Sequence, residues 1–148
     1  ILMLEPLIVT SSLLIGKEMF THTVSTTTKN IYNGIDKVLL NDNIQFKELL
    51  DELDINTKLD IINSFIIDIH KEQKIFNDTL TKTFKYLENS LKTINNEIKS
   101  IDEELINHNK KWFSRIRSSM YPTMLNNLIK HMKILDERFN LLIKLITV

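Results

Sequence analysis

Residues 84–112 read FKYLENSLKTINNEIKSIDEELINHNKKW, and the spacing of their apolar residues decides the fold. These residues recur in alternating steps of 3 and 4 along the stretch. Such a heptad pattern is typical of an α-helix that packs one face against other helices. The positions on this face are Phe84, Leu87, Leu91, Ile94, Ile98, Ile101, Leu105, His108 and Trp112.

The same pattern continues toward the N-terminus and predicts one long central helix over about 57–115. Its phase slips once, between Leu80 and Phe84, as at a stutter in a coiled coil. A break near residue 77, at the Asn-Asp pair, or near residue 100, at a capping-box sequence, is the alternative. The upstream positions of the stripe are Leu59, Ile62, Ile66, Ile69, Gln73, Phe76 and Leu80.

Helices are also predicted on both sides of this central stretch. The N-terminal one covers about 6–40 and begins near Pro6, a residue suited to a first helical turn. Its stripe passes through the β-branched stretch THTVSTTTKN (residues 21–30) without changing phase. A turn at 41–43 and a short amphipathic helix over 44–53 follow. The apolar positions of the N-terminal helix are Leu13, Gly16, Phe20, Val24, Thr27, Ile31 and Ile35.

A C-terminal helix is predicted over about 122–147. Its stripe runs from Tyr121 to Ile146 in steps of 3 and 4, and Ile129, Ile134 and Leu145 widen it. A stripe of that width suits contact with more than one neighbour. No strand pattern with turn chemistry occurs. The sequence therefore predicts an all-α fold, an elongated antiparallel helical bundle or coiled coil, in a single domain 1–148 that is complete or a fragment of a longer chain.

The composition bounds the class of protein. Apolar residues make up 43% and charged residues 26%, as in folded domains. The chain has 22 Ile, 16 Lys and 15 Asn but no Ala, which indicates an AT-rich genome. With no cysteine it has no disulfide, thiolate metal site or thiol nucleophile. We expect a reducing intracellular compartment or a virion, and we find no recognisable signal peptide for secretion.

Charge is spread unevenly along the neutral chain. Residues 1–56 have a net charge of −4 and residues 57–107 of −2, whereas residues 108–148 have a net charge of +6. Pairing of helices within the molecule, an acidic partner and an anionic surface would each use this gradient.

No motif indicates a reaction. The chain has no HExxH sequence and only 2 glycines, too few for a glycine-rich phosphate loop. Asp68 and Glu72 share a helix face, but His70 points away from it, so the three cannot bind one metal. His108 lies on the apolar stripe, where a core histidine is the usual reading. We therefore predict no enzyme, no cofactor, no metal site and no small-molecule substrate.

A basic and aromatic segment follows the heptad stretch. It is either the corner between two helices, where cations favour a helix C-terminus, or a contact site for an anion or a partner. Nucleic acid is not favoured as the ligand, because the chain as a whole is neutral. The residues of this basic-aromatic corner are Lys110, Lys111, Trp112, Arg115 and Arg117.

The N-terminal stretch LEPLIVTSSLLIGKEMF (residues 4–20) resembles the opening of HeLo-like helical domains at the front of fungal immune-type receptors. The resemblance covers Leu4 to about Ile35. It implies a helical bundle whose first helix engages membranes. The residues that would enter lipid are Leu7, Leu13, Leu14 and Phe20.

Together these observations predict a non-enzymatic structural or assembly protein that acts through helix–helix contacts with a protein partner or a second copy. A component of a virion or another large complex fits the composition. The alternative is a membrane-active bundle with an amphipathic N-terminal helix at the membrane surface. The candidate face, as core or as partner interface, consists of Leu87, Leu91, Ile94, Ile98, Ile101 and Leu105.

Overall fold

The computed structural model describes residues 4–41, 43–72, 77–110 and 121–147. These residues form five helices and no strand, so the predicted all-α fold is confirmed. The helices are α1 (Leu4–Leu39), α2 (Ile44–Leu53), α3 (Ile55–Lys71), α4 (Asp78–Lys110) and α5 (Tyr121–Thr147).

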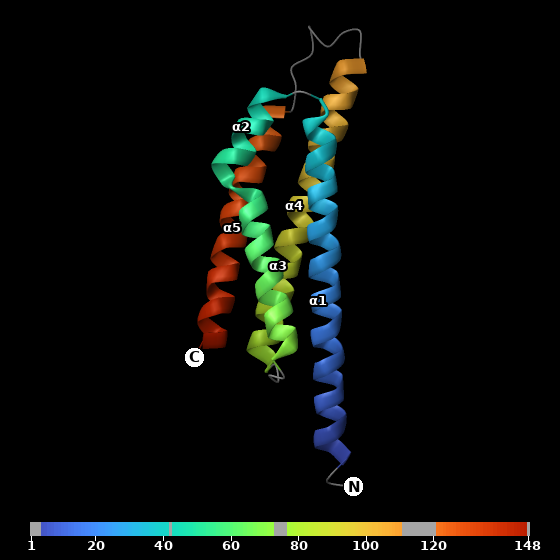
Figure 1. Cartoon of the computed structure of the whole chain (residues 1–148), viewed down its shortest axis with the longest axis vertical. Coiled ribbons are helices and arrows are strands. Elements are labelled where there is room, and N and C mark those ends of the chain that lie inside the picture. The colour runs from blue at the N-terminus through green and yellow to red at the C-terminus, as the bar shows by residue number, and fades with distance from the viewer. Residues whose placement is uncertain (1–3, 42, 73–76, 111–120, 148) are drawn as a thin grey trace.

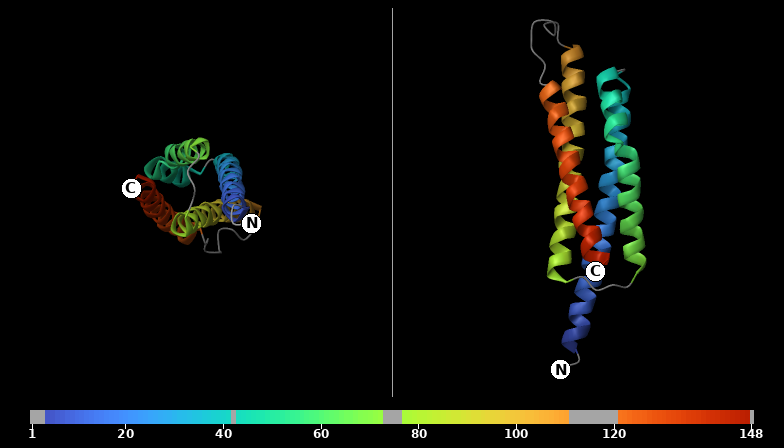
Figure 2. Two further views of the ribbon diagram at one scale, coloured as in Figure 1. Left: turned by 90° about the horizontal axis from the view of Figure 1, so that it is seen from below. Right: turned by 90° about the vertical axis from the view of Figure 1, so that its left-hand side faces the viewer.

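The helices form an elongated bundle of four columns (Figure 1). Helices α2 and α3 follow one another in a single column, and α1, α4 and α5 make the other three. Seen from the end, the order around the bundle is α1, α4, α5 and the α2–α3 column (Figure 2). Helix α4 packs mainly against α1 and α5, and α1 packs against α3. Neighbours α1 and α4 run in the same direction, whereas α4 and α5 run in opposite directions.

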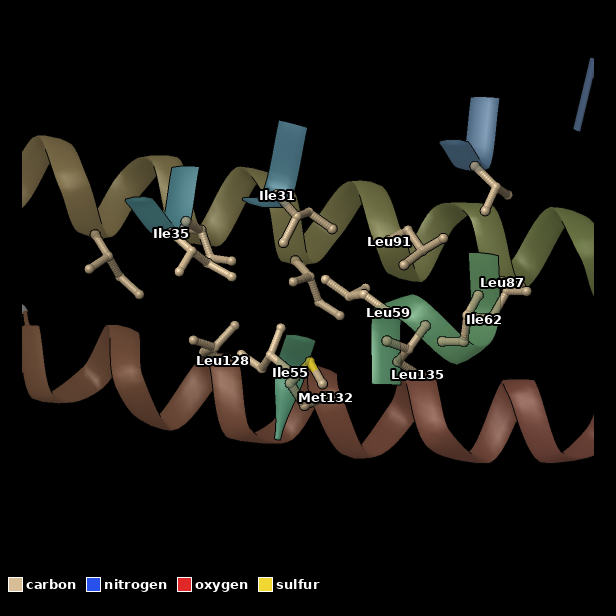
Figure 3. Packing of buried hydrophobic residues seen from close by; sticks show 14 of the residues in the cluster. Ile31, Ile35, Ile55, Leu59, Ile62, Leu87, Leu91, Leu128, Met132 and Leu135 are labelled. Carbon is tan, nitrogen blue, oxygen red and sulfur yellow. The ribbon is translucent and has the colours of Figure 1, made fainter. Parts of the chain in front are cut away.

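The core lies between the helices of the bundle (Figure 3). Every helix, α2 included, contributes buried residues to it. The heptad face of α4 is its largest component, with exposed fractions between 0% and 8% from Phe84 to Leu105. Other core residues, at 2% exposure or less, include Val24, Ile31, Ile35, Phe46, Ile55, Leu59, Ile62, Leu128, Met132 and Leu135.

Helix α1 passes unbroken through its β-branched stretch, as the periodicity predicts. Val24 and Thr27 on that stretch are buried with Ile31 in the core, and this tertiary packing outweighs the low helix propensity of β-branched residues. Further along, Gly34 brings α1 close to α4. A Cβ atom at this position would lie 2.9 Å from Ile98 Cγ2.

The short helix predicted over residues 44–53 is confirmed as α2. It begins where Asn43 Oδ1 accepts a hydrogen bond of 3.0 Å from the Phe46 N–H, which is an N-cap. It ends at Asp54, which has a left-handed backbone with φ of 51°. Asp54 alone separates α2 from α3, so the bend between the two helices occurs at one residue.

The continuous helix predicted over about 57–115 is wrong. Helix α3 ends at Lys71, because Glu72 turns to an extended backbone with ψ of 121°. Helix α4 begins at Asp78, and Asn77 Oδ1 caps it by accepting a hydrogen bond of 2.8 Å from the Leu80 N–H. The two helices run in opposite directions (Figure 1). Folding back brings both halves of the apolar stripe into one core, whereas a straight helix would leave one half uncovered.

Of the two alternative breaks, the one near residue 77 is therefore confirmed and the one near residue 100 is wrong. Ser100 lies inside α4 and donates its hydroxyl to the Asn96 carbonyl at 3.0 Å. Residues 111–115 of the predicted helix lie outside the described residues.

Candidate functional site

A groove between α2 and α5 is the candidate site, and we call it the α2–α5 groove. It has a volume of about 300 Å³. It lies at the end of the bundle where both helices begin (Figure 1). Its lining from α2 is Gln45, Glu48, Leu49 and Glu52, and its lining from α5 is Pro122, Leu125, Asn126 and Ile129.

The helix period places these side chains. On α2, Phe46 is fully buried in the core. Glu48 and Glu52 are one turn apart on a different side of the helix, and this side lines the groove together with α5. On α5, Leu125 and Ile129 are also one turn apart and lie beside the buried Leu128. The groove therefore has acidic residues on one side and apolar residues on the other.

The floor of the groove is apolar. Leu49 is 8% exposed and Leu125 is half-buried, but Ile129 keeps 41% of its surface exposed to solvent. Both glutamates are exposed, and the lining contains no lysine or arginine among the described residues. Such a surface favours an apolar side chain flanked by positive charge.

Two further exposed apolar residues lie at the same end of the bundle. Leu40, just after α1, is 83% exposed, and Ile44, the first residue of α2, is 72% exposed. Among the large apolar side chains whose exposure the structure describes, these two are the most exposed. Exposed apolar surface that gathers in one region is typical of interaction sites.

The candidate face of α4 occupies the core of the molecule. Leu87, Leu91, Ile94, Ile98 and Ile101 are each 0% exposed, and Leu105 is 8% exposed. These residues therefore pack against helices of their own chain. In this arrangement a partner would contact other surfaces.

The remaining predicted residues divide into two groups. Of the basic-aromatic corner, only the backbone of Lys110 is described, as the end of α4; Lys111, Trp112, Arg115 and Arg117 lie outside the described residues. Of the predicted membrane residues, Leu7, Leu13 and Leu14 lie on the helical backbone of α1. Phe20 packs against Phe84 with ring centroids 5.7 Å apart.

A carboxylate of α4 and an imidazole of α5 meet where the two helices pack together. Glu97 Oε1 contacts His131 Nδ1, and both side chains are only partly exposed. Burial raises the pKa of Glu97, and the neighbouring His131 and Lys130 partly offset that effect. Glu97 Oε2 is buried and has no hydrogen-bond partner among the described residues.

Other polar groups fix the helices relative to one another. Arg138 donates hydrogen bonds of 2.8 Å to the Tyr86 carbonyl and to Ser90 Oγ, and its guanidinium lies over the Tyr86 ring. Lys58 Nζ lies 2.8 Å from Asp136 Oδ2 and joins α3 to α5. Burial, with Asp60 nearby, raises the pKa of Tyr32. In the described part of the chain no three acidic or histidine side chains gather as metal ligands.

Comparisons with protein-family models, with curated proteins and with solved structures found no match. Within the described residues, no helix combines the length and the apolar character needed to cross a membrane.

The α2–α5 groove was not predicted from the sequence, although two signals point to it. Gln45, Glu48 and Glu52 have the spacing of one helix face, beside the buried face of a short amphipathic helix. Ile129 widens the apolar stripe of α5, which predicts a second contact surface. In the structure, Ile129 and Leu145 stay largely outside the core, at 41% and 38% exposure.

Proposed function

We propose that this chain is a non-enzymatic assembly protein that docks a helix from a partner or a second copy in the α2–α5 groove. The observation that carries the proposal is Ile129, an isoleucine exposed within a groove whose floor is Leu49 and Leu125. A docking helix would cover this apolar surface, and the acidic side of the groove would orient it.

The polar groups of the bundle support a structural function. The strongest contacts of Lys58 and Arg138 join one helix to another, as described above. Each therefore fixes the packing of the bundle. We further propose that the complex is a virion or another large intracellular assembly. The composition, which indicates an AT-rich genome, and the elongated helical shape are both compatible with such a component.

Site-specific photo-crosslinking tests the proposal. A photoreactive amino acid replaces Ile129 in the groove, and a second variant carries it at Lys85, an exposed position on α4. In cells that make the protein naturally, the Ile129 variant should form one defined adduct with a protein. The Lys85 variant should not form that adduct. Equal labelling from both positions, or no adduct from Ile129, would rule out docking in the groove.

A second candidate function is supported by the shape of α1. The N-terminal part of this helix extends beyond the end of the four-column bundle (Figures 1 and 2). Leu7, Leu13 and Leu14 belong to the N-terminal half of α1, within the stretch that resembles the HeLo-like domains. Insertion at a membrane surface would use these residues, and Phe20 would have to leave its contact with Phe84.

Flotation with anionic liposomes separates the two functions. Binding that is lost in Leu13→Glu would favour the membrane function. A crosslinked adduct from Ile129 that persists in Leu13→Glu, with no flotation of either protein, would favour assembly.

A further inference from the structure

We infer that the α2–α5 groove of one copy of this chain is filled by the face that α4 and α5 form on another copy, so that copies join head to tail. This inference rests on the proposed docking function and names the occupant of the groove. The groove favours exposed apolar side chains flanked by positive charge, and the α4–α5 face presents both.

The apolar part of the α4–α5 face lies where the C-terminal half of α5 packs beside the N-terminal half of α4 (Figure 1). Arg138 fixes the level, because its guanidinium lies over the Tyr86 ring and donates a hydrogen bond to Ser90 Oγ. By helical spacing, Leu141 and Leu145 project on the same side of α5 as Arg138, toward α4. Tyr86 is 54% exposed, and both leucines are also exposed. These three side chains form one apolar patch, which we call the α4–α5 patch.

Positive charge flanks the α4–α5 patch. Lys82 lies one helical turn before the patch tyrosine, and Lys144 lies beside the patch leucines on α5; both lysines are exposed. With Arg138, these cations outnumber Asp78 and Glu137, the exposed acids of the same stretches of α4 and α5. The patch therefore favours an apolar partner surface that carries negative charge.

The α2–α5 groove of another copy has these matching properties. Glu48 and Glu52 supply its negative charge, and Leu125 and Ile129, one helical turn apart, supply apolar surface on α5. The two patch leucines are also one turn apart, so they would lie over Leu125 and Ile129 while the patch lysines approach the glutamates. Complementary charge fixes the orientation of such a contact and speeds association more than it adds affinity.

The two surfaces project on different sides of α5, and this determines how the copies join. By helical spacing, Leu141 points about a third of a turn away from Ile129 around the helix axis. In the end view, α5 lies between α4 on one side and the α2–α3 column on the other (Figure 2). A twofold dimer requires both surfaces on one self-complementary side of the molecule. Here they lie on neighbouring faces of the bundle, so each copy accepts one partner at its groove and offers its patch to another.

A head-to-tail contact continues beyond two copies, because a pair still has one open groove and one open patch. Copies therefore add until they close into a ring or form a filament. In sedimentation velocity on the full chain between about 1 µM and about 1 mM, the mass should rise past that of a dimer. Association should weaken as salt rises from about 0.1 M to about 1 M, where the screening length falls from about 10 Å to about 3 Å. A natural protein that stays monomeric, or that stops at a dimer, overturns the inference.

Two single substitutions identify the surfaces. Ile129→Glu places a charge on the apolar floor of the groove, and Leu141→Glu places an acid in the patch, where it would face the groove glutamates. Each variant alone should remain monomeric at concentrations where the natural protein assembles. An equimolar mixture should form a one-to-one dimer and stop there. The intact patch of the Ile129 variant then fills the intact groove of the Leu141 variant, and the two surfaces left over both carry the new glutamate.

A matched control is Ile61→Glu, which changes an exposed isoleucine of α3 and should leave the association unchanged. Circular dichroism establishes that every variant is folded. The inference is wrong if the Ile129 or the Leu141 variant still assembles on its own, or if their mixture does not stop at a dimer. Loss of association in the control as well would also overturn it.

The crosslinking experiment separates failure of this occupant from failure of the proposed function. Under the inference, the adduct that forms from Ile129 in cells is with a second copy of this chain. An adduct with a different protein, together with a purified protein that stays monomeric, leaves the proposed function standing and rules out only this occupant. No adduct from Ile129 would overturn both.

Discussion

Gly34 of α1 lies against Ile98 of α4 so closely that an added Cβ atom would be 2.9 Å from Ile98 Cγ2. In an exposed helix, Gly→Ala stabilises by about 1 kcal/mol. Here the Ile98 side chain is buried and stiff at its branched Cβ, so it cannot move aside without disturbing the core. The glycine therefore sets the distance between two helices.

Gly34→Ala should lower the free energy of unfolding by about 1–2 kcal/mol, because the overpacked contact outweighs the gain in helix propensity. Urea denaturation measures the change. In an Ile98→Ala background the contact is absent, and the same Gly34→Ala change should become neutral or stabilising. If Gly34→Ala changes the free energy of unfolding equally in both backgrounds, the contact with Ile98 is not what makes alanine unfavourable at this position.

Asp54 should tolerate glycine better than alanine. Its φ of 51° is unfavourable for a residue with a Cβ atom, although aspartate tolerates it better than most residues. Its side chain makes no capping hydrogen bond to α3. We expect Asp54→Ala to lower the stability by about 1 kcal/mol and Asp54→Gly to leave it within about 0.5 kcal/mol. Thermal unfolding of both variants compares their stabilities. If Asp54→Ala is the more stable of the two, the left-handed backbone at Asp54 is contradicted.

The stability of the bundle should depend on pH through Glu97. Burial raises the folded-state pKa of this carboxyl above its ordinary value, so the folded state binds the proton more tightly than the unfolded state. The resulting stabilisation is complete below the unfolded pKa and is lost as pH rises through the folded pKa.

Glu97→Gln removes this linkage. Relative to the variant, the natural protein should therefore become less stable as pH rises from about 4 to about 7. Urea denaturation at a series of pH values measures the difference, and Glu103→Gln, at an exposed position on α4, is the control for loss of one carboxylate. Parallel profiles for Glu97→Gln and the natural protein would contradict the linkage.

Leu91 and Leu40 should differ sharply in their contribution to stability. Leu91 is 0% exposed and Leu40 is 83% exposed. Leu91→Ala should lower the free energy of unfolding by about 2–5 kcal/mol, since it leaves a cavity in the core. Leu40→Ala should change it by no more than about 0.5 kcal/mol. A large loss from Leu40→Ala would mean that this side chain is covered by part of the same molecule.

Much of the fold could be predicted because apolar periodicity depends only on local spacing. The stripe from Phe84 to Leu105 is buried as predicted, and the helix over residues 44–53 has the predicted limits. Periodicity alone did not decide between a continuous helix and the reversal between α3 and α4, and no Gly or Pro lies between Lys71 and Asp78. The Asn77-Asp78 pair was the signal for the break that the structure confirms. A stripe that changes phase near Leu80 fits both a stutter and a turn, and only packing against α1 and α5 decides between them.

The candidate site was less accessible to sequence reasoning. A groove needs two helices brought together, and Glu48 and Ile129 lie 81 positions apart in the chain. Helical spacing predicts which side chains share a face, as it does for Gln45, Glu48 and Glu52. The register between α2 and α5 depends on the whole core, so the pairing of these faces became visible only in the structure.

The parallel neighbours α1 and α4 have a consequence for the rate of folding. Phe20 contacts Phe84, and Gly34 lies against Ile98. In both pairs the two residues are 64 positions apart in the chain. Closing a loop of that size has an entropic cost before the contact forms, and many such contacts raise the contact order. During synthesis, α1 would leave the ribosome well before α4, against which it packs. The chain should therefore fold more slowly than a bundle of successive antiparallel hairpins, and its final packing should follow completion of α4.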